Sequence, residues 1–210
     1  GFTRAFSREF GLTPSEYKTR TPPVKLFIPY QIKTSYRYKL KKEMEMNGVK
    51  TEQKSDRKMQ TVFVQVVERP SRKLILKRGI RANDYFTYCE EVGCDVWGIL
   101  VSVKEALYEP VGLWLPPIMI PAGTSRYAQG VEVPSDYSGQ VPEGFDIIDC
   151  GPCKMMIFQG PPFKDEDFEG AITDLWEVMK SFNPETYGFS WADQDGPRFQ
   201  LEPQGYRGYI

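Results

Sequence analysis

The feature that most constrains the fold of this chain is an internal repeat. Each copy contains an extended apolar run ended by glycine, a helical segment with a tryptophan, a glycine-led aromatic strand and a further strand. The matched segments are 73–79 and 154–160, the segments around Trp97 and Trp176, 112–114 and 188–191, and 127–133 and 206–210. The matched glycines recur at a nearly constant separation of about 80 residues, which is typical of duplication. The repeat predicts an α+β fold of two strand-helix-strand-strand modules, which form an antiparallel sheet with two helices and a central groove.

Local patterns predict where the elements of each module begin and end. Asn83 or Asp84 is expected to cap the first helix and Asp165 the second, each at the start of an apolar stripe of helical spacing. Gly93 within the first helix costs about 1 kcal/mol relative to alanine, so we expect close packing there. The expected strands are 61–67, 72–77, 111–115, 127–133, 145–148, 154–158, 187–191 and 198–202.

Charge is distributed unevenly along the 210 residues, although the net charge is only -1. Residues 1–81 carry 20 Lys or Arg against 7 Asp or Glu, whereas residues 82–210 carry 7 against 21. A basic arm joined to an acidic globule is typical of proteins that meet nucleic acid, and a solvated charged face is the alternative. No apolar run approaches the roughly 20 residues of a membrane span, and residues 1–10 lack the apolar core of a signal peptide. We therefore expect a cytoplasmic protein.

The chain contains no histidine. This excludes His-based catalytic triads and His metal ligands, and leaves carboxylates, tyrosines, lysines and thiols as the reactive groups. Cys89 and Cys94 are not spaced as ligands of a tetrahedral zinc site, so we expect no metal and no cofactor. Four reduced cysteines fit a cytosolic protein.

The segment Cys150-Gly-Pro-Cys153 has the spacing of the thioredoxin redox pair. Redox chemistry needs the first cysteine at a helix N-terminus, where its thiolate is stabilised. Residues 154–159 favour a strand over the long helix that this requires, and Asp149 would raise the pKa of a neighbouring thiol. We expect a connection with two incidental thiols, with a working dithiol as the alternative.

The first 17 residues predict two short helices. Phe2, Phe6 and Phe10 recur every four residues and line one helical face. Gly11 ends that helix, and Thr13-Pro-Ser-Glu16 has the pattern of a capping box with proline at the first helical position. An ordinary amphipathic helix pair is the simplest interpretation.

Residues 1–17 also resemble the end of the DNA-binding domain of AraC-type transcription regulators. In that family the segment is the recognition helix of the second helix-turn-helix, followed by the last helix of the domain. The resemblance implies DNA contacts from Arg4 and Arg8. By the family pattern the rest of the domain precedes Gly1 in the full-length protein, so we expect this chain alone to bind DNA weakly.

Glu132 interrupts an apolar strand at the expected groove. A carboxylate in an aromatic-lined cleft is costly unless paired, and a cationic ligand is one possible partner. Strand alternation offers the other interpretation, in which Val131 and Val133 point inward and Glu132 points into water. Aromatic rings that could wall the groove, each of which is also compatible with the core, are Trp97, Trp114, Tyr127, Tyr187 and Trp191.

Residues 61–210 resemble the GyrI-like effector-binding domain, which is found fused to AraC-type and MerR-type DNA-binding domains and also alone. The matching segments are 73–79, 95–98, 109–115, 127–134, 154–160, 187–191 and 205–210. The resemblance implies a groove that binds amphipathic, often cationic small molecules through aromatic rings and an acidic residue on a strand of the second module. Glu132 is the counterpart of that residue in the first module, and Glu202 is the alternative.

These observations divide the chain into the tail of an AraC-type domain (1–21), a proline-containing linker (22–60) and a GyrI-like domain (61–210). The expected function is the ligand-sensing domain of a transcription regulator. Its partners would be a small-molecule effector and DNA, the latter through the N-terminal domain of the full-length protein, with a homodimer possible and no membrane. A hydrolase that uses Glu132 as base and Tyr127 as proton donor is the main alternative, because some GyrI-like members hydrolyse small molecules. A third interpretation is a lone interaction module that blocks another protein.

Overall fold

The computed structural model describes residues 1–24, 62–93, 95–163 and 167–201. Several expectations fall outside these residues: most of the linker, the last strand at 206–210, the cap at Asp165, and Glu202.

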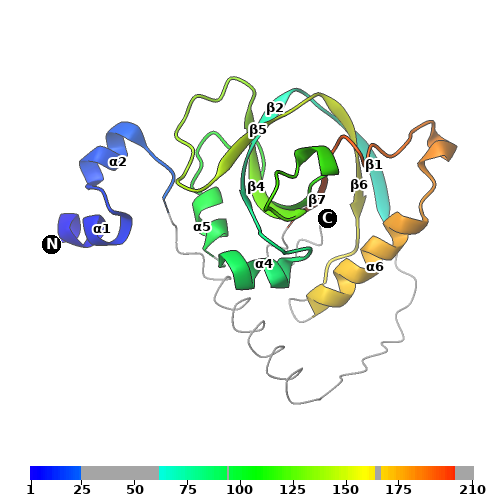
Figure 1. Cartoon of the computed structure of the whole chain (residues 1–210), viewed down its shortest axis with the longest axis horizontal. Coiled ribbons are helices and arrows are strands. Elements are labelled where there is room, and N and C mark those ends of the chain that lie inside the picture. Colours follow the sequence, from blue (N-terminus) through cyan, green and yellow to red (C-terminus); the bar gives the residue numbers. More distant parts are fainter. Residues whose placement is uncertain (25–61, 94, 164–166, 202–210) are drawn as a thin grey trace, which may run out of the picture.

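Two antiparallel sheets form the centre of the molecule (Figure 1). The larger sheet has the order β5-β2-β4-β3-β7, and its strands are β2 (Arg72–Arg78), β3 (Val111–Trp114), β4 (Tyr127–Pro134), β5 (Asp146–Cys150) and β7 (Arg198–Leu201). The smaller sheet pairs β1 (Phe63–Arg69) with β6 (Cys153–Gln159). The predicted α+β class with antiparallel pairing is confirmed.

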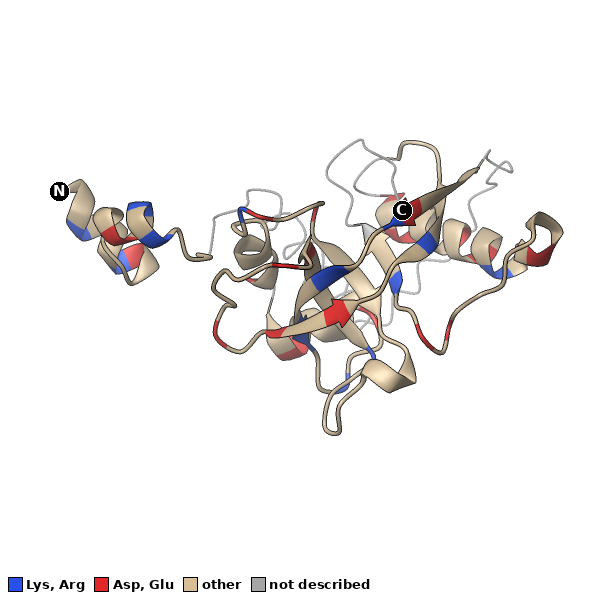
Figure 2. Ribbon diagram, turned by 90° about the horizontal axis from the view of Figure 1, so that it is seen from above, with Lys and Arg blue, Asp and Glu red and all other residues tan. Residues whose placement is uncertain are grey.

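Three helices pack against these sheets. Helices α4 (Tyr85–Val92) and α5 (Val96–Leu100) contact β4, and α6 (Phe168–Ser181) contacts β6. Two 3-10 helices, η1 (Pro117–Met119) and η3 (Pro184–Tyr187), lie in the connections. Helices α1 (Phe2–Phe10) and α2 (Pro14–Arg20) lie at one end of the molecule, away from both sheets (Figures 1 and 2).

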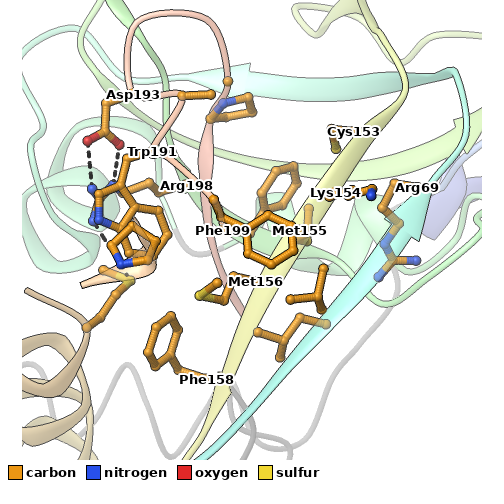
Figure 3. Close-up of a pocket in the computed structure, with 18 of the residues that line it drawn as sticks. Arg69, Cys153, Lys154, Met155, Met156, Phe158, Trp191, Asp193, Arg198 and Phe199 are labelled. Carbon is orange, nitrogen blue, oxygen red and sulfur yellow. Dashed lines mark hydrogen bonds and ion pairs between the residues drawn. The ribbon is translucent and has the colours of Figure 1, made fainter. Parts of the chain in front are cut away.

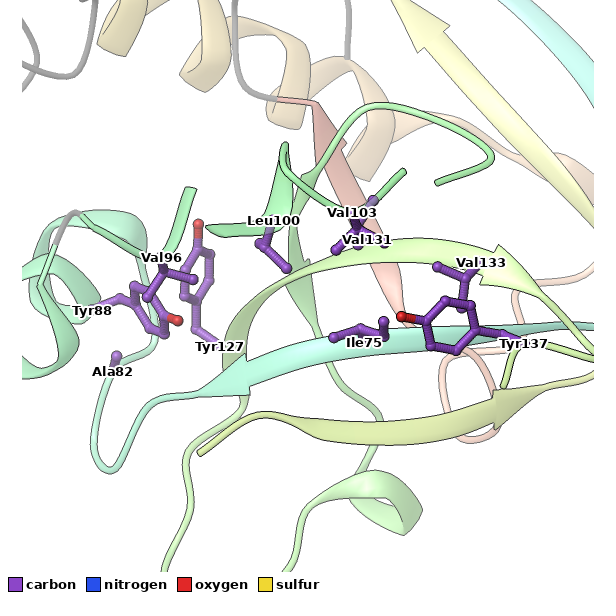
Figure 4. Packing of buried hydrophobic residues seen from close by; sticks show 10 residues of the cluster. All are labelled: Ile75, Ala82, Tyr88, Val96, Leu100, Val103, Tyr127, Val131, Val133 and Tyr137. Carbon is purple, nitrogen blue, oxygen red and sulfur yellow. The ribbon is translucent and has the colours of Figure 1, made fainter. Parts of the chain in front are cut away.

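The core lies on both faces of the larger sheet. Along β2, Ile75 points into a cluster with Tyr88 of α4 and Val131 of β4, whereas Leu74 and Leu76 point into a second cluster on the opposite face. Figure 4 shows the first of these clusters around β2 and β4. Because both faces of β4 are covered, its residues from Tyr127 to Val133 are all buried, and a polar residue on this strand is buried whichever way it points.

The first module contains two short helices where one long helix is expected. Asp84 caps α4 by accepting a hydrogen bond from the backbone N–H of Thr87, which confirms one of the two predicted caps. The helix ends at Gly93, whose φ of 91° lies in the region that only glycine adopts easily. Nothing lies within 4 Å of the position that a Cβ there would take. The expectation of close packing at Gly93 is therefore wrong, and backbone conformation is the reason for the glycine.

The expected strand at 187–191 is also wrong. Pro184 begins η3, the side chain of Asn183 caps it by accepting from the backbone N–H of Glu185, and Gly188 ends it with a left-handed φ of 77°. A left-handed residue reverses the chain direction, so the aromatic run 187–191 leaves η3 without joining a sheet. This places Phe189 and Trp191 in a connection beside α6 and β6.

Candidate functional site

A cavity of about 260 Å³ lies between the two sheets and α6. Its walls come from β1 and β6, from one face of α6, from the connection 189–197 and from the face of the larger sheet that carries Glu132 and Phe199. Figure 3 shows part of this lining, including Met155, Met156, Phe158 and Phe199. Strands from both modules and helix α6 therefore enclose one space.

The walls are mainly apolar. Met155, Met156 and Phe158 of β6 line the cavity together with Leu175 and Met179 of α6. Methionine side chains are unbranched and adapt to ligands of different shape, which is why they are common at binding surfaces of broad specificity. An apolar lining with a few polar groups is typical of small-molecule sites.

A buried ion pair lies in the cavity wall formed by the larger sheet. Arg72 of β2 donates a hydrogen bond from Nε to Oε1 of Glu132 on β4, and these residues are only 3% and 4% exposed. Arg72 also donates from Nη1 to the carbonyl oxygen of Gly151 at 3.0 Å. Burial lowers the pKa of Arg72, but the hydrogen bond and the charge of Glu132 outweigh that effect and raise the pKa above its ordinary value.

This arrangement decides between the two interpretations of Glu132. The carboxylate does not point into water, because the second face of β4 is covered as well. Its charge is balanced by Arg72, so the fold itself supplies the cationic partner that a buried carboxylate requires.

A second ion pair lies at the aromatic end of the cavity. Arg198 of β7 donates from Nε and Nη2 to the two carboxylate oxygens of Asp193, both at 2.8 Å, and these hydrogen bonds lower the pKa of Asp193. The Arg198 guanidinium also lies 5.5 Å from the ring centre of Trp191. The two arginines of the larger sheet that line the cavity are thus both paired with carboxylates.

Two further cations, Arg69 and Lys154, line the end of the cavity formed by β1 and β6. The guanidinium of Arg69 lies 3.4 Å from the ring centre of Tyr108, and its buried Nε makes no hydrogen bond within the described part of the chain. Lys154 approaches Glu68 at 3.9 Å, and both side chains are mostly exposed.

The structure separates the six residues expected to bind ligand. Glu132 and Trp191 line the same cavity. Trp114 instead lines a neighbouring cavity of about 470 Å³, which shares Trp176 with the first, and its Nε1 donates to the carbonyl oxygen of Asn83. Tyr187 is 65% exposed and stacks on Phe182.

Trp97 and Tyr127 belong to the packed interior. Tyr127 is fully buried in the first core cluster, where its ring packs edge-on against Tyr88 at 5.3 Å (Figure 4). Trp97 is 3% exposed on α5. Neither residue lines the cavity described above.

Several cavity residues were missed by sequence reasoning, namely Arg69, Arg72, Met155, Met156, Trp176 and Arg198. The adjacent methionines in the strand that contains Ile157 and Phe158 were a usable signal, because this residue type adapts to variable partners. The arginines gave no local signal, since a charge at a strand end is ordinarily solvated.

The two thiols of the Cys-Gly-Pro-Cys segment lie on different sheets. Cys150 is the last residue of β5, and Cys153 is the first residue of β6 and lines the cavity. A strand follows the segment, as expected, and no helix begins there. Burial raises the pKa of the Cys150 thiol, which is the opposite of what a redox nucleophile needs.

The N-terminal helices have the predicted local structure. Thr13 and Glu16 form a reciprocal capping box at α2, and Gly11 ends α1 in the left-handed conformation. Arg4 and Arg8 are both exposed on α1. The segment that follows α2 contacts the globule, where the backbone N–H of Val24 donates to Ser102 Oγ at 2.7 Å.

Within the described residues, no helix combines the length and the apolar character required to cross a membrane. The same residues contain no group of three or more Cys, Asp or Glu side chains arranged to hold a metal ion.

Comparisons with known proteins gave two distant structural similarities. No family model matches the chain, and no curated protein sequence matches it. One similar solved structure is described as SAV2435 bound to tetraphenylphosphonium, with 13% identity and a TM-score of 0.43 over 70% of this chain and 88% of that one. Another is a cryo-EM structure of an EcmrR–DNA complex, with 14% identity and a TM-score of 0.35 over 84% of this chain and 67% of that one. Because the sequence identities and TM-scores are this low, these similarities carry no argument about function. The proposed function is based on the residues of the cavity and of the N-terminal helices.

Proposed function

We propose that this chain is the small-molecule-sensing part of a transcription regulator, with a GyrI-like effector-binding domain that follows the end of an AraC-type DNA-binding domain. The observation that carries this proposal is the cavity of about 260 Å³ between the two sheets and α6, with its apolar walls and its buried Arg72–Glu132 pair. The ligand is an amphipathic molecule whose apolar body lies against Met155, Met156 and Phe158.

The N-terminal helices support the regulatory half of the proposal. An AraC-type recognition helix must present basic side chains to DNA, and Arg4 and Arg8 are exposed on α1. The capping box and Gly11 determine the angle at which α2 follows α1.

A continuous series of contacts joins the cavity to these helices. Tyr108 lines the cavity, and the backbone N–H of the preceding residue, Leu107, donates to the carbonyl oxygen of Glu132 at 2.8 Å. Earlier in the same segment, Ser102 accepts from the backbone of Val24, and Lys104 lies 5.5 Å from the ring centre of Tyr17 on α2. A ligand that binds better to one arrangement of segment 101–108 would thereby favour one placement of the helix pair.

The proposal is for binding without turnover. A hydrolase would need Glu132 and Tyr127 at the substrate, but Glu132 is engaged by Arg72, and Tyr127 is fully buried outside the cavity lining. General acid–base catalysis requires both groups within hydrogen-bond reach of the reacting atoms. Only Glu132 lines the cavity.

The test compares a variant that fills the cavity with a matched surface variant. Met156→Trp places an indole in the space between β6 and α6, whereas Ile118→Trp adds the same side chain at a position that is 77% exposed on η1. A panel of amphipathic probes is screened by thermal stabilisation, since a ligand at 100 times its Kd stabilises by about 2.7 kcal/mol. We expect the wild-type protein and Ile118→Trp to respond and Met156→Trp not to respond. Equal responses from both variants would show that binding occurs elsewhere.

A further inference from the structure

We propose that β1 and β6 form a hinged lid over the cavity, which opens for ligand entry and is held closed by Arg72. The lid is the two-stranded ribbon of residues 63–69 and 153–159, and its hinge consists of residues 70–71 and 151–152. The hinged ribbon is a property of the fold, whereas its role in ligand entry rests on the proposed ligand-binding function.

The hinge is an interruption of strand pairing at the same level on both strands. In the chain β1 continues into β2 and β5 continues into β6, and these strands pair with each other on both sides of the interruption (Figure 1). Pairing stops at Arg72 opposite Cys150 and resumes at Arg69 opposite Cys153. The residues left out of the ladder are Pro70, Ser71, Gly151 and Pro152. Because a proline has no N–H to donate and each strand has one here, the two sheets are joined by two short unpaired connections.

Beyond the hinge, side-chain packing holds the ribbon against the rest of the molecule. Among the described residues, no backbone hydrogen bond joins β1 or β6 to an element outside the ribbon. Arg69 lies over the ring of Tyr108 at 3.4 Å, and Phe158 packs edge-on against Phe182 at 5.1 Å. Phe158 is also the one buried residue of the two strands, whereas β2 runs through both core clusters. A two-stranded ribbon with so few buried contacts is typical of segments that open locally.

The ribbon is one wall of the cavity. Val66 of β1 and Met156 and Phe158 of β6 line the cavity, and the larger sheet contributes Glu132 and Phe199 to another wall. The hinge lies between the two sheets, so rotation about the hinge moves one wall relative to the other. An outward rotation of the ribbon therefore opens the cavity to solvent.

Arg72 ties both connections of the hinge to the larger sheet. It is the first residue of β2, and its Nη1 donates to the carbonyl oxygens of Pro70 at 3.4 Å and Gly151 at 3.0 Å. Its Nε donates to Glu132 on β4. One buried guanidinium thus connects a residue of each unpaired connection to the centre of the sheet through charge-assisted hydrogen bonds. This gives the Arg72–Glu132 pair the role of a latch.

Lid opening is measured first without a ligand. Leu175 of α6 is 6% exposed, and a Cβ at Gly160, directly after β6, would lie 3.7 Å from it, so the end of the ribbon covers this side chain. In Leu175→Cys, modification of the new thiol by iodoacetamide reports opening, and peptide mapping distinguishes it from the native thiols. Leu113→Cys, at a fully buried position of the larger sheet, reports unfolding of that sheet. We expect the thiol at position 175 to react at least about tenfold faster.

The latch is tested by removing both of its charges. Arg72→Met with Glu132→Leu leaves no unpaired buried charge, but it removes the hydrogen bonds to the two connections of the hinge. We expect the thiol of Leu175→Cys to react about tenfold faster in this background and the thiol of Leu113→Cys to react at an unchanged rate. An equal acceleration of both thiols would show that the pair stabilises the whole core and is no latch.

A reversible cross-link tests the role in ligand entry. Gly160→Cys and Leu175→Cys are combined in a background whose four native cysteines are replaced by alanine, and the two thiols are bridged by a short bis-thiosulfonate. The probe is N-phenyl-1-naphthylamine, a neutral dye that fluoresces in apolar sites, and its binding is followed by stopped flow. We expect the bridge to slow association and dissociation by about tenfold or more, and reduction of the bridge to restore both rates.

The outcomes separate the lid from the function. If the thiol at position 175 reacts no faster than the one at position 113, or if the bridge leaves the dye kinetics unchanged, the lid is wrong, while binding of the dye still supports the proposed function. If the thiol at position 175 reacts rapidly but the wild-type protein does not bind the dye, the ribbon is hinged and the sensing function in this cavity fails. Thermal unfolding verifies that each variant is folded, and the cross-link leaves Arg72 unchanged, so it tests the lid even if the double variant unfolds.

Discussion

Arg72 and Glu132 lie on neighbouring strands, 60 positions apart in the chain, and form a hydrogen-bonded ion pair that is almost completely removed from water. Both residues are buried in the larger sheet and also line the cavity. Removal of one partner leaves an uncompensated buried charge, whereas removal of both leaves none.

The first prediction concerns the stability of this pair. Glu132→Gln leaves the Arg72 charge without a counter-ion, so we expect a loss of about 3–5 kcal/mol in the free energy of unfolding, measured by chemical denaturation. The double variant Arg72→Met, Glu132→Leu should recover most of the loss. Glu177→Gln, which breaks the exposed pair with Lys180, should cost less than about 1 kcal/mol. Equal costs for Glu132→Gln and Glu177→Gln would contradict the burial argument.

The second prediction concerns acid stability. The Glu91 carboxylate accepts backbone hydrogen bonds from Ile80, Arg81 and Ala82. Burial raises the pKa of Glu91, but the hydrogen bonds from the three backbone N–H groups outweigh burial and lower the pKa below its ordinary value. A lowered folded-state pKa contributes stability above the unfolded-state pKa, and this contribution is lost as the pH falls below about 4.5 through the folded-state value.

Glu91→Gln is therefore expected to destabilise the protein by about 1–2 kcal/mol at pH 7 and by progressively less as the pH falls below about 4.5. Denaturation curves at several pH values measure this difference. The exposed Glu143→Gln is the control and should show no such convergence. A penalty for Glu91→Gln that is constant from pH 7 to pH 3 would argue against the hydrogen-bonded carboxylate.

The third prediction concerns Gly130 at the centre of β4. A Cβ there would lie 2.8 Å from the carbonyl oxygen of Ile75, which is backbone and cannot move aside. Gly130→Ala should cost about 1–3 kcal/mol in unfolding free energy. Gly151→Ala is the matched control, because a Cβ at that position meets no atom within 4 Å. If both variants unfold at the same denaturant concentration, close strand approach is not the reason for the glycine.

The fourth prediction concerns thiol reactivity at the cavity. Cys153 is exposed and lines the cavity, whereas Cys150 is buried and its thiol pKa is raised by that burial. Iodoacetamide should modify Cys153 well before Cys150, as measured by peptide mapping over time. A bound ligand should slow the reaction at Cys153, and Cys153→Ser should abolish the rapid phase. Faster reaction at Cys150 would instead indicate a redox-type site.

Local elements were predictable because their determinants lie close together in the chain. The Thr13–Glu16 box, the Asp84 cap and the strand after Cys153 depend on neighbours within a few residues, and each is confirmed. The prediction of a strand at 187–191 was wrong. A 3-10 helix begins at Pro184 and is ended by Gly188, and these two residues decide the local structure although the aromatic residues favour a strand. The prediction that one helix runs through Gly93 was wrong for a similar reason. The positive φ of Gly93 ends the first helix, so the apolar stripe is divided between α4 and α5.

The candidate site was predictable only in part. The unusual position of Glu132 within an apolar strand was visible in the sequence, and so was the aromatic character of Trp191. Nothing local distinguished Trp191, which lines the cavity, from Trp97, which is buried in α5, because both have the same chemistry.

By itself the sequence determined most of the strands and the helix caps, because hydrophobic period and capping residues act over a few residues. It also determined that β4 would carry one carboxylate among apolar neighbours. Only the tertiary structure decided that β1 pairs with β6 and that Arg72 lies beside Glu132. The physical reason is that a buried charge is balanced by whichever group strand pairing brings next to it, and that pairing joins residues far apart in the chain.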